Sequence, residues 1–490
     1  MWKNGLTRYF SFRQFHEPGG YLEIWRIGWP LILLNASNTI MMITNRIFLA
    51  RNSPEEIAAA MPTSQLFFTM MAFFLVTTGF TATVVAQSHG SRDRAGCVRA
   101  TWNGFYFGVM VAALLAVALP VAGRWIFLHN GHDPRIAGYE LEYFTGMSAC
   151  AGFTCMETAF LCFFTGRGKT QVVAFIKGFG CLLCIPLNYL LIFGAAGLPA
   201  LGILGAGIAN SMANFVTMLM AFCFFFFTPQ REYPTRSCRE MKWEYIRKLL
   251  FFGTPAGLQT FIRNVAFAIV VMMIGHIGNE PLAATSIALS VNMIGTMPMI
   301  GLLDATSIAT GQYIGSGRLL VAERIAGRSF RMFLLWLILP SFFYIFCPEL
   351  LIHLFSSNQS GVTGMRFDVI ASQVKVILLM AVFFNIMDGL RFITLGSLRG
   401  AGDTKVTLCI GLATSWLLQI PGTILLIYVF NASVTAVWAF LSFYIAVDAF
   451  FMLLRRRSGA WKTIRVIDLP APQTETAADC VAATEARVRL

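Results

Sequence analysis

Charged side chains are scarce in this chain. Asp, Glu, Lys and Arg make up 12% of its 490 residues and hydrophobic side chains 57%, whereas about 25% of residues are charged in soluble domains. A soluble fold of this length would need a polar surface that this composition does not supply. The composition therefore argues against a soluble protein and predicts one that crosses a membrane several times.

The motifs of common catalytic sites are also missing. The sequence contains neither an H-E-x-x-H zinc motif nor a G-x-S-x-G nucleophile elbow. Residues 396–405 (GSLRGAGDTK) differ from a phosphate-binding loop, because Asp403 and Thr404 separate Gly402 from Lys405. An acid at that place would repel phosphate. We expect no enzymatic activity, no metal site and no cofactor.

Twelve apolar stretches are long enough to cross a membrane. About 20 apolar residues in a helix span roughly 30 Å of hydrocarbon. The stretches centre near residues 38, 75, 112, 152, 182, 213, 262, 297, 338, 382, 417 and 443. Because a helix satisfies its own backbone groups within lipid, the sequence predicts an all-α polytopic membrane protein with twelve transmembrane helices.

The net charge of +13 follows the expected topology. About 28 of the 37 Lys and Arg residues lie in the N-terminus, the even-numbered connections and the C-terminus. The odd-numbered connections hold only Arg51, Arg124, Arg135 and Arg366. Since basic connections usually remain in the cytoplasm, we predict a multi-pass protein of an inner membrane with both termini cytoplasmic. The charge reports orientation and does not indicate a nucleic-acid partner.

The two halves of the chain are related by an ungapped repeat. A shift of 225 residues aligns Gly28 with Gly253, Pro30 with Pro255, Gln87 with Gln312 and Gly90 with Gly315. Each half thus shows G-x-P at the entry to its first span and Q-x-x-G-S at the exit from its second. A shift of 234 residues aligns Gly166, Gly168 and Thr170 with Gly400, Gly402 and Thr404. These glycines predict one tight turn per half, between the fourth and fifth spans.

Two parallel six-span repeats predict two pseudo-symmetric lobes with the substrate path between them. We place the N-lobe at residues 21–227 and the C-lobe at 249–455. A cytoplasmic linker, residues 228–248, joins them. Residues 1–20 are expected to form a cytoplasmic or interfacial segment, and residues 456–490 a polar, disordered cytoplasmic tail.

The chain combines twelve spans with the G-x-P and Q-x-x-G motifs, with LRGAGDTK after the tenth span and with GLPALGILGAGIAN (197–210) before the sixth. In this combination it resembles the MATE (multidrug and toxic compound extrusion) family. The resemblance covers roughly residues 20–455. It implies a V-shaped antiporter in the bilayer that exports small, often cationic amphiphiles in exchange for protons or sodium. We expect it to act as a monomer. The larger group to which the family belongs includes flippases, so a flippase or exporter of lipid-linked or anionic amphiphiles is the alternative.

Asp388 is the leading candidate for ion coupling, because it lies deep in the tenth span and matches the second-lobe aspartate of the family pattern. Arg391 follows on the same helix face, so a permanent structural ion pair is the competing interpretation. Glu157 and Asp304 are further intramembrane acids that could carry a proton.

The first lobe departs from the family pattern. Asn45 and Asn188 occupy the positions at which family members commonly carry aspartates, and an amide does not titrate. In the seventh span, Arg263 aligns with a glutamate of some sodium-coupled relatives. It could pair with Asp388 or hold an anionic group, and Arg391 could do the same in a flippase. Asn38 and Gln259 are additional polar candidates for the substrate cavity.

Overall fold

A computed structural model describes residues 15–129, 133–197, 199–229, 231–356 and 367–467. Every regular element in these ranges is a helix. The first half contains α3 (Tyr21–Asn52), α4 (Pro54–Gly79), α5 (Thr81–Gly90), α6 (Arg94–His129), α7 (Pro134–Gly166), α8 (Thr170–Phe193) and α9 (Gly202–Phe226). The second half contains α10 (Trp243–Lys248), α11 (Thr254–Ile277), α12 (Asn279–Gly315), α13 (Leu319–Phe346), α14 (Pro348–Ser356), α15 (Phe367–Ala401), α16 (Thr404–Leu412), α17 (Ile420–Ile424) and α18 (Val434–Arg457).

The predicted number of spans is confirmed in the described part of the chain. It contains 11 helices that are long and apolar enough to cross a membrane, and a bent pair brings the number to 12. The bent pair is α12, in which Asn279–Met293 and Gly295–Gly315 meet at 51°. Short π-helical turns join α10 to α11 and α16 to α17, so each of these pairs belongs to one continuous span.

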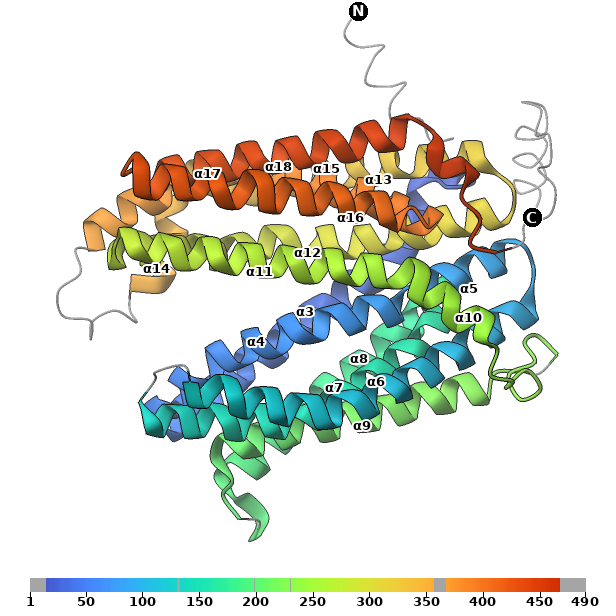
Figure 1. Ribbon diagram of the computed structural model, residues 1–490, viewed down its shortest axis with the longest axis horizontal. Helices are drawn as coiled ribbons and strands as arrows, with labels where there is room; N and C mark the ends of the chain where they lie inside the picture. The colour runs from blue at the N-terminus through green and yellow to red at the C-terminus, as the bar shows by residue number, and fades with distance from the viewer. Residues whose placement is uncertain (1–14, 130–132, 198, 230, 357–366, 468–490) are drawn as a thin grey trace, which may run out of the picture.

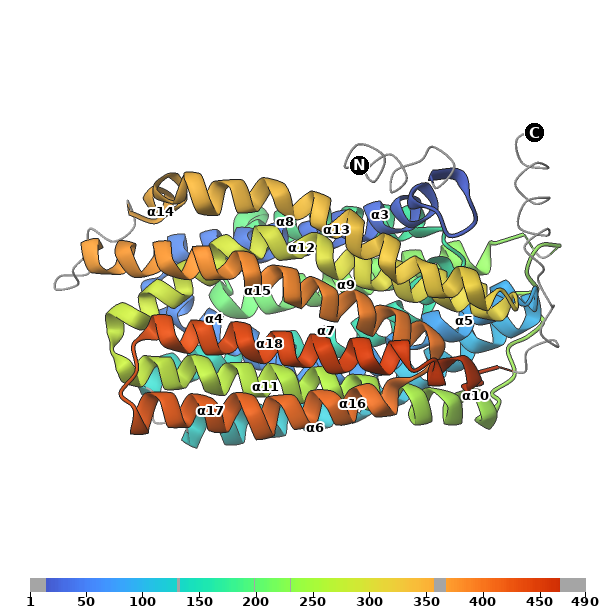
Figure 2. The same cartoon turned by 90° about the horizontal axis from the view of Figure 1, so that it is seen from above.

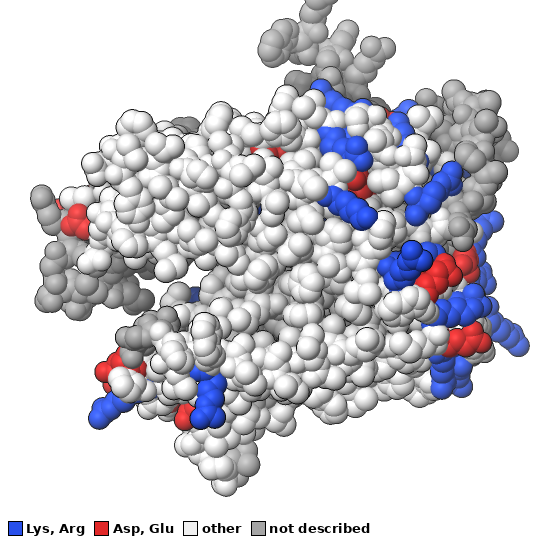
Figure 3. All heavy atoms as spheres, in the orientation of Figure 1, with Lys and Arg blue, Asp and Glu red and all other residues white. Residues whose placement is uncertain are grey.

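The helices form two bundles that meet at one end of the molecule (Figure 1). Helices α3–α9 form the N-lobe and α10–α18 the C-lobe, and the lobes touch through α3 with α12, α4 with α11, and α5 with α12. Figure 2 shows the C-lobe helices side by side from a second direction. Lys and Arg gather at the end where the lobes meet, which we call the basic end, and the molecule is hollowed between the lobes at the opposite end (Figure 3).

The repeated G-x-P motifs lie inside their helices, so the expectation that they open the spans is wrong. Helix α3 begins at Tyr21, before Gly28, and the span containing Gly253 begins at Trp243. The glycines instead face the other lobe. A Cβ on Gly28 would lie 3.4 Å from the Cβ of Ala305, and one on Gly253 would lie 2.7 Å from the carbonyl oxygen of Thr77. Both therefore permit close packing between the lobes.

The predicted glycine turns are present. Gly168 (φ +75°) lies between α7 and α8, and Gly402 (φ +87°) lies between α15 and α16. This left-handed backbone region suits glycine, which has no Cβ.

Two expected segment boundaries need correction. The inter-lobe linker was expected to reach residue 248, but helix begins at Trp243, because Trp243–Ile277 forms one apolar span. The tail was expected to be disordered from residue 456, but 458–467 pack against the basic end, where Trp461 is 2% and Val466 1% exposed. These two buried apolar side chains anchor a segment whose other residues are partly or fully exposed. Residues 468–490 lie outside the described ranges.

Candidate functional site

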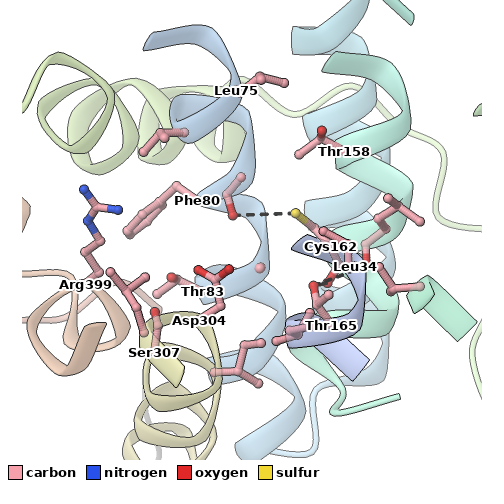
Figure 4. A pocket seen from close by; sticks show the side chains of 18 of the residues that line it. Leu34, Leu75, Phe80, Thr83, Thr158, Cys162, Thr165, Asp304, Ser307 and Arg399 are labelled. Atoms are coloured by element: carbon pink, nitrogen blue, oxygen red, sulfur yellow. Dashed lines mark hydrogen bonds between the residues drawn. The ribbon is translucent and has the colours of Figure 1, made fainter. Parts of the chain in front are cut away.

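A cavity of about 330 Å³ lies between the two lobes (Figure 4). Its N-lobe walls come from α3, α4, α5, α7 and α8, and its C-lobe walls from α11, α12 and α15. Leu31, Leu34, Leu75, Phe80 and Leu161 contribute apolar surface. Mostly apolar walls with a few polar groups are typical of a site for a small amphiphilic molecule.

Asp304 brings a carboxylate to this cavity. It lies on α12, its side chain is exposed, and it forms no hydrogen bond or salt bridge with a described residue. Figure 4 shows the carboxylate pointing toward the space between α12 and the N-lobe helices. An acid at membrane depth usually faces a wet cavity or a partner. Asp304 faces the cavity and remains available to a cation or a proton.

Arg399 is the cation on the same side of the cavity. It comes from α15 and attracts Asp304 electrostatically without a salt bridge. Its Nη2 donates to the Oε1 of Gln259 at 3.3 Å and to the Oγ1 of Thr260 at 3.1 Å. Gln259 in turn donates from Nε2 to the carbonyl of Thr407 at 2.8 Å. The guanidinium is thus held by neutral groups, and Gln259 positions it.

Glu157 and Lys177 form an ion pair between α7 and α8 behind the N-lobe wall. The Nζ of Lys177 donates to the Oε2 of Glu157 at 2.6 Å, and the Glu157 side chain is fully buried. Lys177 lines the cavity, whereas Glu157 does not. Because Glu157 already has a cationic partner and does not face the cavity, it is a weaker candidate for ion coupling than Asp304.

The remaining charged candidates form one closed network inside the C-lobe. The Nε of Arg391 donates to the Oδ1 of Asp388 at 2.7 Å, as the structural interpretation of this pair expects. The Nη2 of Arg263 donates to the Oδ2 of Asp448 at 2.9 Å, a partner from α18. The Nε of Arg391 lies 3.9 Å from the same Asp448 oxygen, which links the two pairs. Two guanidinium groups therefore balance two buried carboxylates.

The N-lobe asparagines form a neutral cluster. The Nδ2 of Asn45 donates to the Oδ1 of Asn210 at 3.2 Å, and the Nδ2 of Asn188 donates to the carbonyl of Cys184 at 2.8 Å. The Cys184 thiol also donates to the Oδ1 of Asn210 at 3.2 Å. All four side chains are buried. Two of these hydrogen bonds connect α3 and α8 to α9.

The structure thus separates the candidate residues into groups. None of the described residues proposed for the cavity lines it, namely Asn45, Asn188, Gln259, Arg263 and Arg391. The reason is that each finds a buried partner in its own lobe. The side chain of Asn38 lies outside the described part of the structure. Sequence reasoning missed Arg399 as a cavity residue, because it lies beside the glycine turn that follows the tenth span and not in the middle of a span.

Comparisons with known proteins agree with this architecture. The MatE family model matches residues 30–190 and 255–425, one segment in each lobe. A probable multidrug resistance protein NorM from Pseudomonas aeruginosa is 26% identical over 468 residues, covering 94% of this chain and 93% of the relative. The multidrug resistance protein MdtK from Yersinia pestis is 26% identical over 412 residues, covering 81% of this chain and 85% of the relative.

Solved structures show the same fold. A multidrug resistance MATE family transporter of the MOP superfamily in an outward-facing conformation superposes with a TM-score of 0.80 at 18% identity, covering 92% of this chain and 98% of the other. The eukaryotic MATE transporter AtDTX14 gives a TM-score of 0.79 at 17% identity, covering 95% and 98%.

These relatives and solved structures are named as multidrug resistance proteins and transporters, which are membrane transporters rather than enzymes. With the family model matched in both lobes, this chain belongs to the MATE family.

Proposed function

We propose that this protein exports small amphiphilic organic cations across an inner membrane by secondary active antiport. The basic end faces the cytoplasm, and the lobes alternate between opening at this end and at the opposite end. The relatives named as multidrug resistance proteins support a broad substrate range. One chain supplies both lobes and the cavity, so we propose that a monomer suffices.

The observation that carries this proposal is the unpaired carboxylate of Asp304 among apolar cavity walls. A single carboxylate binds a proton or an organic cation, and the two compete. Such competition is what antiport requires, because each ligand leaves when the other arrives. We therefore propose Asp304 as the coupling residue in place of Asp388, which Arg391 holds in the C-lobe network.

The driving forces are adequate for this exchange. A pH gradient of one unit supplies about 1.4 kcal/mol per proton, and 100 mV supplies about 2.3 kcal/mol per net charge moved. Exchange of one proton for one organic cation moves no net charge, so the pH gradient alone sustains about a tenfold concentration ratio. A sodium gradient would act in the same way at the same carboxylate.

The first test is Asp304→Asn in proteoliposomes, with ethidium as the transported cation and an imposed pH or sodium gradient. We expect gradient-driven ethidium transport in the wild type and its loss in the variant, because the amide neither titrates nor neutralises a cation. Asp368→Asn is the matched control, since Asp368 is exposed near the start of α15 and away from the cavity. Wild-type transport by folded Asp304→Asn protein would contradict the proposal.

A second prediction separates Asp304 from Asp388. Asp388→Asn alone leaves two guanidinium groups facing one buried carboxylate, that of Asp448, so we expect reduced folding yield and transport. The double variant Asp388→Asn, Arg391→Gln removes both charges and is expected to restore gradient-driven ethidium transport per folded molecule. Transport that stays absent in the folded double variant would contradict the assignment of coupling to Asp304 alone.

Arg399 favours one alternative function, the export or flipping of an anionic amphiphile. Its guanidinium lines the cavity and is hydrogen-bonded only to neutral groups among the described residues. A guanidinium in this setting suits a phosphate or carboxylate. Transport of a fluorescent phosphatidylglycerol that is lost in Arg399→Gln, together with no ethidium transport by the wild type, would establish this alternative.

A further inference from the structure

Two glutamines at equivalent places in the repeat cross between the lobes at the basic end. The Nε2 of Gln87, in the N-lobe, donates to the carbonyl oxygen of Gly400, in the C-lobe, at 2.9 Å. The Nε2 of Gln312, in the C-lobe, donates to the carbonyl oxygen of Gly166, in the N-lobe, at 2.7 Å. Each lobe thus gives one donor to the other lobe and takes one in return.

The acceptors are carbonyl groups at helix ends, which have no hydrogen-bond partner within their own helix. Gly166 is the last residue of α7, and Gly400 is next to the last of α15. Final carbonyls of a helix have no partner one turn further on. In both turns the backbone amides that follow bond to other carbonyls, those of Phe164 and Thr165 in one, and of Leu398 and Arg399 in the other. The glutamine of the opposite lobe satisfies the carbonyl that remains.

Glycine at two further repeat positions lets the backbones meet. A Cβ on Gly90 would lie 2.0 Å from the carbonyl oxygen of Gln312, and a Cβ on Gly315 would lie 2.0 Å from that of Gln87. The ends of α5 and α12 therefore touch backbone to backbone beside the two hydrogen bonds. Gln87 is fully buried in this contact.

We propose that Gln87 and Gln312 form a reciprocal latch that closes the basic end and that both bonds release together when the lobes part there. The two glutamines are positioning residues for transport and touch neither substrate nor ion. Amide-to-carbonyl bonds suit this task, because they are short and directional yet carry no charge whose separation would cost much. Water replaces both partners once the end opens.

The symmetry of the latch makes it cooperative. One bond joins α5 to α15 and the other joins α12 to α7, while α5 and α12 contact each other directly. Loss of either bond therefore weakens the same contact between the lobes. Opening at the basic end brings the lobes together at the hollowed opposite end. The inference rests on the alternating access proposed above, and its test measures lobe movement rather than cation transport.

The test is hydrogen–deuterium exchange of the full chain in lipid nanodiscs, followed by mass spectrometry. Gln87→Glu and Gln312→Glu keep the side-chain length but replace the donor with a carboxylate that repels the carbonyl. We expect either change to raise amide exchange about 2- to 10-fold, the range given by one net hydrogen bond. The rise should appear in both turns, residues 163–172 and 396–405, and exchange near 52–56 and 277–281 at the opposite end should fall.

Gln171→Glu is the matched control, because Gln171 is exposed at the same end of the molecule. It introduces the same charge without removing a bond between the lobes and should leave both ends unchanged. If the glutamate variants do not fold, Gln87→Met and Gln312→Met remove the donor at nearly the same volume. A rise confined to the turn that lost its donor, with no change at the opposite end, would overturn the latch. Failure of ethidium transport in the wild type would leave this result unaffected.

Discussion

Arg263→Leu is expected to destabilise the protein by roughly 3–5 kcal/mol, the usual cost of removing one partner from a buried ion pair. Asp448 is fully buried, and its Oδ2 accepts a hydrogen bond from the Nη2 of Arg263 at 2.9 Å. Without it, two carboxylates face the single guanidinium of Arg391. Unfolding of the purified protein in mixed detergent micelles, followed by tryptophan fluorescence, measures the loss.

A charge-balanced variant distinguishes lost charge from lost packing. Arg263→Leu combined with Asp448→Leu leaves Asp388 and Arg391 as a balanced pair, and we expect most of the stability to return. Lys375→Met is the matched control for a lost salt bridge at the surface. Lys375 lies 2.7 Å from Glu349, but both side chains are well exposed, so the cost should stay below about 1 kcal/mol. If Arg263→Leu lowers the free energy of unfolding no more than this control does, the charged network is solvated.

The spans and the turns were predictable because their causes are local. Twelve apolar stretches have the length that a bilayer requires, and each becomes a helix because no other open structure satisfies the backbone in lipid. The turns at Gly168 and Gly402 follow in the same way, since positive φ selects glycine.

The partners of the buried charges were not predictable from the sequence. Asp388 and Arg391 are three residues apart, so their pairing was visible as one alternative. Arg263 and Asp448 are separated by 185 residues, and only the folded arrangement of the C-lobe, which brings the two side chains together, decides that Arg263 binds Asp448 rather than an anion. The place of Asp304 also depends on packing, because Arg399 lines the same cavity but forms no salt bridge with it.

The repeat showed which residues correspond but not which residues meet. Gln87 and Gln312 align, as do Gly166 and Gly400, and this alignment is compatible with contacts within each lobe or between lobes. The structure shows contacts between lobes. The tail illustrates a different limit. Its polar composition predicted disorder throughout, but two buried side chains, Trp461 and Val466, anchor residues 458–467.

Gly315→Ala is expected to slow transport strongly while leaving each lobe folded. The new methyl group would lie 2.0 Å from the carbonyl oxygen of Gln87, and this backbone atom cannot turn aside. Helices α5 and α12 must then separate at the basic end. Overpacking of this kind costs about 1–3 kcal/mol, which lowers the population closed at the basic end by about 5- to 150-fold. Transport in proteoliposomes should fall by a comparable factor, and Gly90→Ala should match it.

Gly327→Ala supplies the control for the glycine change itself. Gly327 lies in the interior of α13, and a Cβ there would meet no atom within 4 Å. Alanine favours the helix over glycine by up to about 1 kcal/mol, so this variant should fold at least as well as the wild type and transport normally. Loss of transport in Gly327→Ala as well as in Gly315→Ala would point to a general need for flexible helices. Loss in Gly315→Ala and Gly90→Ala alone would show that the cycle requires the lobes to close backbone to backbone at the basic end.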